Sequence, residues 1–297
     1  MFEHKGAIGL AKKSQMGPLK AYGLPALFDP RKEMAASDRL FNCTAVDVQC
    51  TTPWAALKSE PLSAATTVSE VLFGEPLQIL GRQDAWLKVA AVVDGYVGWV
   101  LTGTTTRGLV HPTHRISVPM AHIYRSADLK SEPLLPVPMG SYLHVKTPTA
   151  LTNGFLALET GGFIFASHIA ALGRFSSDPV TIAESFLGAP YLWGGRTSMG
   201  MDCSGLIQLA LAAAGHRVHR DSGAQFKSLG RALTDQEQPA RGDLAFFPGH
   251  VGWMIDGVHL LHANATNMAV TIDPVDQVTD WIRIAGATEP FLGFSRL

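Results

Sequence analysis

The chain has 297 residues, of which 46% are hydrophobic and 16% are charged. This composition is typical of a folded globular protein with room for two or three domains, and it excludes a largely disordered chain. The formal net charge is −1 and the basic residues are scattered, so we expect neither a nucleic acid nor a membrane surface as a partner. No uninterrupted apolar run reaches the roughly 18 residues that a membrane-spanning helix needs.

Residues 1–36 are rich in Gly, Pro and Lys and show little periodicity, so we predict an extended N-terminal arm. The first twenty residues lack the apolar core and the small-residue cleavage site of an export signal. Three cysteines, Cys43, Cys50 and Cys203, leave one thiol unpaired in any disulfide scheme, which favours a reducing compartment. Together these features indicate a cytoplasmic protein, with secretion by another route as the alternative.

Residues 37–106 change to short alternating runs separated by turns, at 75–81, 85–90 and 95–100, which predicts a small β-barrel. Leu-Phe-Gly-Glu at 72–75 and Asp-Gly-Tyr-Val-Gly-Trp-Val at 94–100 resemble bacterial SH3-like domains. The resemblance implies a module that targets the protein or gates access to its substrate.

Residues 107–175 repeat this pattern more loosely and predict a second, divergent SH3-like barrel. Gly161 and Gly162 stand where a hairpin turn is expected. The expected strands are 115–119, 122–125, 141–145, 154–158 and 162–165.

Residues 176–297 begin with a turn and a helix start at Asp178-Pro179, which marks the last predicted domain boundary. A short amphipathic helix is expected at 180–187. A second helix and then several strands follow, which predicts an α+β domain with an antiparallel sheet. The expected strands are 242–247, 250–255, 257–263 and 291–295.

The second helix of this domain, over 201–215, places a cysteine at its start. Its alanine-rich body favours a helix, Asp202 is the expected N-cap, and Gly215 suits the helix end. Cys203 then falls in the first turn, where free backbone N–H groups and the helix dipole favour a thiolate nucleophile. The alternative is a structural cysteine, because cysteine is among the most buried residue types.

Two histidines on the predicted strands are candidates for the base and the third polar group that a thiol nucleophile needs. His250 opens a strand on which alternation places it on one face with Gly252 and Met254. His262 follows on the next strand, at a spacing that a hairpin can bring level with His250.

The last third of the chain resembles the NlpC-type papain-like cysteine peptidases, which cut bacterial cell-wall peptides. The resemblance implies a papain-like fold with Cys203 as nucleophile, His250 as general base and His262 as the third member. It rests on five motifs in order: Pro-Tyr-Leu-Trp-Gly-Gly at 190–195, Met-Asp-Cys-Ser-Gly-Leu at 201–206, Arg-Gly-Asp-Leu-Ala-Phe-Phe at 241–247, Gly-His-Val-Gly at 249–252 and Leu-His-Ala at 261–263.

Within that family, two SH3-like domains before the catalytic domain resemble the γ-D-glutamyl-L-diamino acid endopeptidases. These enzymes act on stem peptides with a free N-terminal L-Ala, and a free amine requires a carboxylate partner. The resemblance implies substrate-binding roles for Asp221, Ser222, Trp193, Ser204, Tyr96 and Glu70. Each of four has a structural alternative: a helix N-cap for Asp221, core packing for Trp193, and a barrel core or surface role for Tyr96 and Glu70.

We therefore expect a cysteine peptidase that hydrolyses the γ-D-glutamyl-L-diamino acid bond of peptidoglycan stem peptides during cell-wall recycling. The rival functions are a less restricted cell-wall lysin, an amidase, and a non-catalytic adaptor that binds wall peptides. His111 with His114, and His216 with His219, have ligand-like spacing but no nearby Cys or carboxylate, so neither a metal nor another cofactor is expected. The oligomeric state and the preferred diamino acid stay open.

Overall fold

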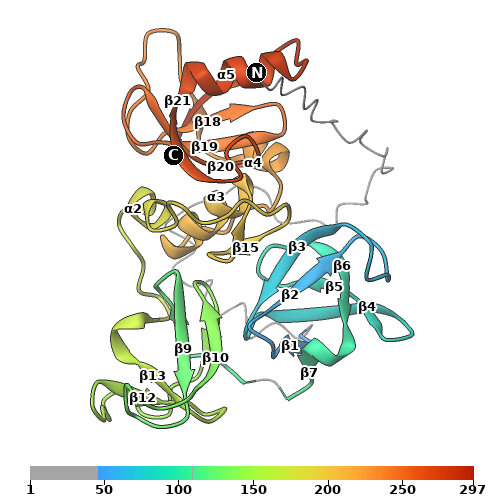
Figure 1. The fold of residues 1–297 in the computed structure, drawn as a ribbon, viewed down its shortest axis with the longest axis vertical. Coiled ribbons are helices and arrows are strands. Elements are labelled where there is room, and N and C mark those ends of the chain that lie inside the picture. Colours follow the sequence, from blue (N-terminus) through green and yellow to red (C-terminus); the bar gives the residue numbers. More distant parts are fainter. Residues whose placement is uncertain (1–45, 109) are drawn as a thin grey trace, which may run out of the picture.

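The computed structural model describes residues 46–108 and 110–297. Figure 1 shows three lobes, coloured blue to cyan, green, and yellow to red in chain order. The arm predicted for residues 1–36 and the thiol of Cys43 lie outside the described residues. The three lobes fit the predicted division at 106/107 and 175/176, which stays a prediction.

The first lobe is one antiparallel sheet of seven strands that closes around an apolar core. Its three central strands, β4, β5 and β6, confirm the alternating runs predicted at 75–81, 85–90 and 95–100. A 3-10 turn, η2 (Thr102–Thr104), precedes the last strand. The strands are β1 (Val48–Cys50), β2 (Trp54–Lys58), β3 (Thr67–Leu72), β4 (Pro76–Gln83), β5 (Trp86–Ala91), β6 (Val97–Leu101) and β7 (Thr105–Thr106).

The second lobe contains a four-stranded and a three-stranded sheet around a separate core. The expected strands are present, most of them shorter than expected, while β10 and β14 fall outside the expected ranges. The prolines of β10 disfavour a ladder, which hides this strand in the sequence. β10 occupies an edge of its sheet, the position where proline is tolerated. The elements are β8 (His114–Ile116), β9 (Met120–Tyr124), β10 (Pro133–Pro138), β11 (Tyr142–Leu143), β12 (Phe155–Ala157), β13 (Phe163–Phe165), η3 (Ala166–His168) and β14 (Ile169–Ala171).

The third lobe has the predicted mixture of helices and an antiparallel sheet, whose strand order is β17-β22-β18-β19-β20-β21. Its helices are α2 (Pro179–Glu184), α3 (Cys203–Ala213), α4 (Ser222–Ser228) and α5 (Val275–Ile284). A short hairpin, β15 (Arg196–Thr197) with β16 (Gly200–Met201), stands apart from the sheet. The sheet strands are β17 (Arg231–Ala232), β18 (Leu244–Phe247), β19 (His250–Met254), β20 (His259–Asn264), β21 (Ala269–Pro274) and β22 (Gly293–Arg296).

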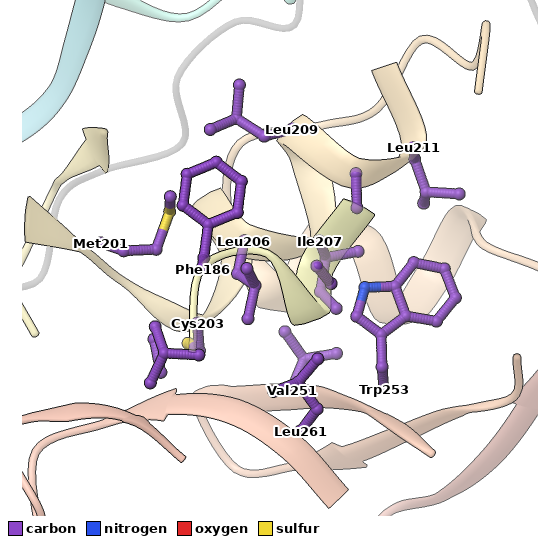
Figure 2. Close-up of a cluster of buried hydrophobic side chains, with 14 of the residues drawn as sticks. Phe186, Met201, Cys203, Leu206, Ile207, Leu209, Leu211, Val251, Trp253 and Leu261 are labelled. Atoms are coloured by element: carbon purple, nitrogen blue, oxygen red, sulfur yellow. The ribbon is translucent and has the colours of Figure 1, made fainter. Parts of the chain in front are cut away.

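This sheet is buried on both faces. α2 and α3 pack on one face, where Val251, Trp253 and Leu261 belong to their core. α5 packs on the other face over Met254 and Leu260. The central strands are therefore apolar along most of their length, as strands covered on both sides are. Figure 2 shows Val251 and Leu261 reaching from the sheet toward α3.

The helix α3 begins and ends as the sequence predicts. The Asp202 side chain accepts a hydrogen bond from the Gly205 backbone N–H and caps the N-terminus. Gly215 has a φ of 94° just after the last turn. Cys203 is thus the first residue of a helix that is buried along most of its length.

Polar contacts join the first lobe to the third. Arg196 at the β15 hairpin makes two hydrogen bonds to the Glu75 carboxylate, and both side chains are buried. Gln208 on α3 donates to the carboxylate of Asp94. These contacts fix the first lobe against the side of the third lobe that carries the start of α3. In the described part of the chain, no helix is long and apolar enough to cross a membrane.

Candidate active site

The sulfur of Cys203 lies where the start of α3 meets the start of β19. Its hydrogen-bond partners are the backbone N–H groups of Val251 and Ser204. Val251 directly follows His250, so the structure brings the predicted nucleophile to the strand end that carries the predicted base. One of these N–H groups belongs to the first turn of α3 and the other to β19.

The protonation state expected for Cys203 is corrected by its burial. The side chain is only 8% exposed, and burial together with the nearby Asp202 carboxylate raises the pKa of the thiol. The two backbone N–H groups lower this pKa, but burial dominates. The helix terminus therefore does not make a standing thiolate, and Cys203 must lose its proton during the reaction.

A tight turn positions His250. Phe247 and His250 are paired across the β18–β19 hairpin, with Pro248 and Gly249 between them. Gly249 has a φ of 72°, which matches the third position of a type II turn that carries proline at the second. The ring of His250 packs against Phe247 with its centroid 5.7 Å away.

His262 contacts His250 diagonally across the sheet, so the expectation that the two lie level is wrong. The strand register pairs Trp253 with Leu261, and its continuation places His262 opposite Gly252. A Cβ at Gly252 would lie 2.9 Å from the Cβ of His262, so glycine makes room for this side chain. The two rings meet with Nε2 of His250 2.7 Å from Nδ1 of His262.

A carboxylate that the sequence did not reveal lies behind His262. The Asp273 Oδ2 is 3.1 Å from Nε2 of the His262 ring, which is fully buried. Burial lowers the pKa of His262, whereas Asp273 raises it; burial also lowers the pKa of His250. Both histidines are therefore neutral in the free protein, which is the form that can accept a proton.

A buried ion pair supports the start of α3. Arg220 makes two hydrogen bonds to the Asp202 carboxylate and a third, from Nη1, to the hydroxyl of Ser204. Its Nε donates to Ser69 of the first lobe. The hydroxyl of Ser204 is thus occupied by protein partners, and its predicted place in the cleft lining stays a prediction.

Glu70 extends from the first lobe to the third. Its Oε2 accepts a hydrogen bond of 2.7 Å from the Arg196 backbone N–H. Within the described residues, the other carboxylate oxygen has no hydrogen-bond partner. Burial raises the pKa of Glu70 to about 6. A barrel-core role is therefore excluded, because the side chain faces the neighbouring lobe.

Tyr96 and Asp221 meet across the same boundary. The Tyr96 hydroxyl donates to Oδ1 of Asp221 over 3.2 Å. Asp221 precedes α4 but its side chain makes no capping hydrogen bond, so the alternative in which this carboxylate serves only as an N-cap is wrong. Burial raises the pKa of Asp221, and Arg220 opposes this effect. Ser222 is the first residue of α4, beside this carboxylate.

Two aromatic residues lie in the loop before β15. Trp193 is 64% exposed, which contradicts the core alternative for this side chain. The sequence pattern assigned no role to Tyr191, yet burial and the neighbouring Cys203 raise the pKa of its hydroxyl. Its position two residues before Trp193 was visible in the sequence, but its proximity to the sulfur was not.

Comparison with known proteins identifies a family for the catalytic domain and a family for the first lobe. The NlpC/P60 family profile matches residues 188–283, and the profile of the bacterial dipeptidyl-peptidase Sh3 domain matches residues 57–103. The gamma-D-glutamyl-L-lysine dipeptidyl-peptidase of Bacillus subtilis (strain 168) is 30% identical over 228 residues, which cover 69% of this chain and 74% of that protein. Dipeptidyl-peptidase 6 of Lysinibacillus sphaericus is 29% identical over 247 residues, covering 75% and 89%.

A crystal structure of an NlpC/P60 family protein from Bacillus cereus ATCC 10987 superposes with a TM-score of 0.69 at 20% identity. The match covers 84% of this chain and 98% of that one, and it supports the fold alone. The predicted architecture, an α+β papain-like catalytic domain after an SH3-like domain, is confirmed. On the similarity to the Bacillus subtilis relative together with the profile match, the chain belongs to the NlpC/P60 family of cysteine peptidases.

Proposed function

We propose that this peptidase hydrolyses the bond between γ-D-glutamate and the L-diamino acid of peptidoglycan stem peptides whose N-terminal L-Ala carries a free amine. The observation that carries the proposal is the pair of carboxylates, Glu70 and Asp221, at the boundary between the first lobe and the catalytic domain. Both carry oxygens that the described protein atoms leave unbonded. The relatives named as gamma-D-glutamyl-L-lysine dipeptidyl-peptidases support the same substrate class.

The protein recognises the substrate amine through its positive charge. Glu70 and Asp221 both lie within electrostatic reach of Arg220 and Asp202, which places them around the same end of α3. An ammonium group is a compact donor that pairs with carboxylates, and an acetylated amine has no charge to pair. Substrates with a blocked N-terminus therefore lose this interaction. We assign Ser222, Trp193 and Ser204 to the walls around the bound dipeptide.

The reaction begins with the neutral pair of Cys203 and His250. The thiol proton moves to His250 as the sulfur attacks the γ-carbonyl carbon, and the carbonyl electrons move onto the oxygen, which the backbone N–H groups at the start of α3 stabilise. The C–N bond then breaks, and His250 gives its proton to the leaving amine of the diamino acid. Water attacks the thioester with His250 again as base, releasing L-Ala-γ-D-Glu and the free thiol.

We place this activity in the recycling of wall peptides within the cytoplasm. The free thiols of Cys50 and Cys203 support a reducing compartment. A less restricted lysin or an amidase is the rival in the same class. A non-catalytic adaptor is disfavoured by the assembled Cys203, His250 and His262.

Mass spectrometry of the products from L-Ala-γ-D-Glu-diamino acid-D-Ala, with and without an N-terminal acetyl group, tests the proposal. We expect L-Ala-γ-D-Glu from the free peptide and almost none from the acetylated one. Equal cleavage of both peptides would overturn the free-amine specificity. Turnover by the Cys203→Ala variant would overturn the assignment of the nucleophile, and release of D-Ala alone would overturn the cleavage site.

A further inference from the structure

Asp273 and Asn264 both lie within hydrogen-bond distance of Nε2 of the His262 ring. Nδ1 of the ring lies 2.7 Å from Nε2 of His250. On the other side, Nε2 lies 3.1 Å from Oδ2 of Asp273 and 3.3 Å from Nδ2 of Asn264. A neutral imidazole carries one N–H donor and one acceptor nitrogen, so these neighbours decide which nitrogen holds the proton.

The surrounding hydrogen bonds favour Asp273. The amide oxygen of Asn264 accepts from the Asn267 backbone N–H over 2.8 Å, which fixes the orientation of the amide. The amide nitrogen of Asn264 then donates to the Thr271 hydroxyl over 2.7 Å, and that hydroxyl donates to Oδ2 of Asp273 over 2.5 Å. A carboxylate can only accept, and it is a stronger acceptor than a neutral group. The His262 Nε2 therefore carries the proton and donates it to Asp273.

The tautomer of His262 then sets that of His250. With the His262 proton on Nε2, its Nδ1 is an acceptor, so the short contact between the rings requires His250 to donate from Nε2. The Nδ1 of His250 is left without a proton, and it becomes the free base of the ring. We propose that Asp273 is a positioning residue that acts through His262 to keep His250 in the tautomer able to accept the Cys203 proton.

The carboxylate also stabilises the charge that the reaction creates. After the thiol proton reaches Nδ1 of His250, the ring is an imidazolium that donates from Nε2 toward His262. Asp273 pairs with the far side of the His262 ring and so supplies a negative charge next to this charged pair. With Asn264 as the donor instead, both rings would reverse, and Nδ1 of His250 would already carry a proton and could not accept one from the thiol. This inference rests on the catalytic roles proposed for Cys203 and His250.

A purely structural role for Asp273 is the alternative. Asp273 accepts from Thr271 and from the Asn267 side chain and so helps to fix β21 beside β20. Loss of those bonds alone lowers stability but leaves the proton on the His262 ring where it is. The position of that proton is therefore the observation that separates the two roles.

Nitrogen NMR of histidine-labelled full-length Cys203→Ala protein reads the proton positions without any substrate. We expect both His250 and His262 to be protonated on Nε2, and we expect the additional change Asp273→Asn to shift both rings toward Nδ1. Protonation of His262 on Nδ1 while Asp273 is intact would overturn the proposal. So would identical tautomers in the two proteins. This measurement does not depend on which peptide is cut.

Kinetics on an otherwise unchanged chain give the second readout. We expect Asp273→Asn to lower kcat by about 10²- to 10³-fold with KM within about twofold, because the wrong tautomer blocks the chemical step. Asp273→Glu should recover part of the loss. The matched control is Asp256→Asn, which disrupts the exposed His259–Asp256 pair at the start of β20 and should leave kcat unchanged.

The pH profile of kcat completes the test. The titratable group in contact with the histidine pair is Asp273 from β21, and the apolar Phe247 from β18 packs against the ring of His250. Because Asp273 raises the pKa of His262, its removal should move the acidic limb of kcat to lower pH. A kcat within threefold of the wild type, with an unmoved limb, would contradict the proposal. If Asp273→Asn gave that result while Cys203→Ala was inactive, the role of Asp273 would be refuted but the proposed function would not.

Discussion

The first and second β lobes contact the catalytic domain at different places around α3. The first lobe uses buried groups to contact two arginines outside the helix: Glu75 pairs with Arg196, and Ser69 accepts from Arg220, which pairs with the N-cap Asp202 of α3. The second lobe reaches the end of α3, where Arg115 donates to the backbone carbonyls of Ala212 and Ala213. A cation is favoured at that end by the helix dipole.

These contacts indicate that the two β lobes serve different purposes. The first lobe contacts Arg196, Arg220 and Asp221 around the start of α3, so changes there should alter both stability and substrate recognition. The second lobe touches carbonyls at the far end of the helix, so changes there should alter stability alone. Three variants and one change of pH, in order of decreasing expected effect, test this contrast.

The buried pair between Arg196 and Glu75 gives the largest expected effect. Arg196→Met leaves the Glu75 carboxylate buried without its partner, and we expect a loss of about 3–5 kcal/mol in the free energy of unfolding. Denaturant titration measures this loss. The double variant Arg196→Met with Glu75→Leu should recover much of it, and a single variant as stable as the wild type would contradict the account.

Asp221→Asn removes one of the two carboxylates assigned to the substrate amine. We expect kcat/KM for the free-amine peptide to fall, because the substrate ammonium loses a partner. The fall should correspond to a loss of about 2–4 kcal/mol of transition-state stabilisation. Stability should change little, since the side chain caps no helix. An unchanged kcat/KM would return Asp221 to a structural role.

The protonation of Glu70 predicts a pH dependence of recognition. Its pKa is raised to about 6, so the carboxylate is charged above this pH and becomes neutral below it. Between pH 7 and about pH 5 we expect kcat/KM for the free-amine peptide to fall about tenfold as the ammonium loses a partner. The pKa values of His250 and His262 are lowered, so they do not produce this limb. Glu70→Gln should flatten it, and an identical limb in that variant would assign it to another group.

Arg115→Met gives the smallest expected effect and tests the second lobe. Loss of its hydrogen bonds to the end of α3 should cost about 1–2 kcal/mol in the free energy of unfolding. The ratio of kcat/KM between free and acetylated peptides should stay as in the wild type. A changed ratio would show that the second lobe also takes part in recognition.

Local features of the fold could be predicted from the sequence. The cap at Asp202, the glycine after α3 and the alternating runs of the first lobe depend on neighbouring residues, and all were confirmed. β21 was missed, because Ala269–Pro274 has no clear alternation and ends in a proline. Asp273 was missed with that strand.

Contacts between distant elements could not be predicted. The diagonal approach of His262 to His250 depends on the register of a hairpin and on the missing Cβ of Gly252. The meeting of Tyr96 with Asp221 joins residues 125 positions apart in the chain. The protonation state of Cys203 depends on burial by the whole catalytic domain, which outweighs the local effect of the helix terminus.

The central claim is that carboxylates from two different lobes read the free amine of the substrate. Its most direct test is the ratio of kcat/KM for the free peptide to that for the acetylated peptide, measured in the wild type and in the Glu70→Gln/Asp221→Asn double variant. We predict a ratio of about 100 or more in the wild type, since the acetylated peptide cannot form the ion pair with the carboxylates, and a ratio within a few-fold of one in the double variant. A ratio near one in the wild type, or an unchanged large ratio in the double variant, would contradict the account.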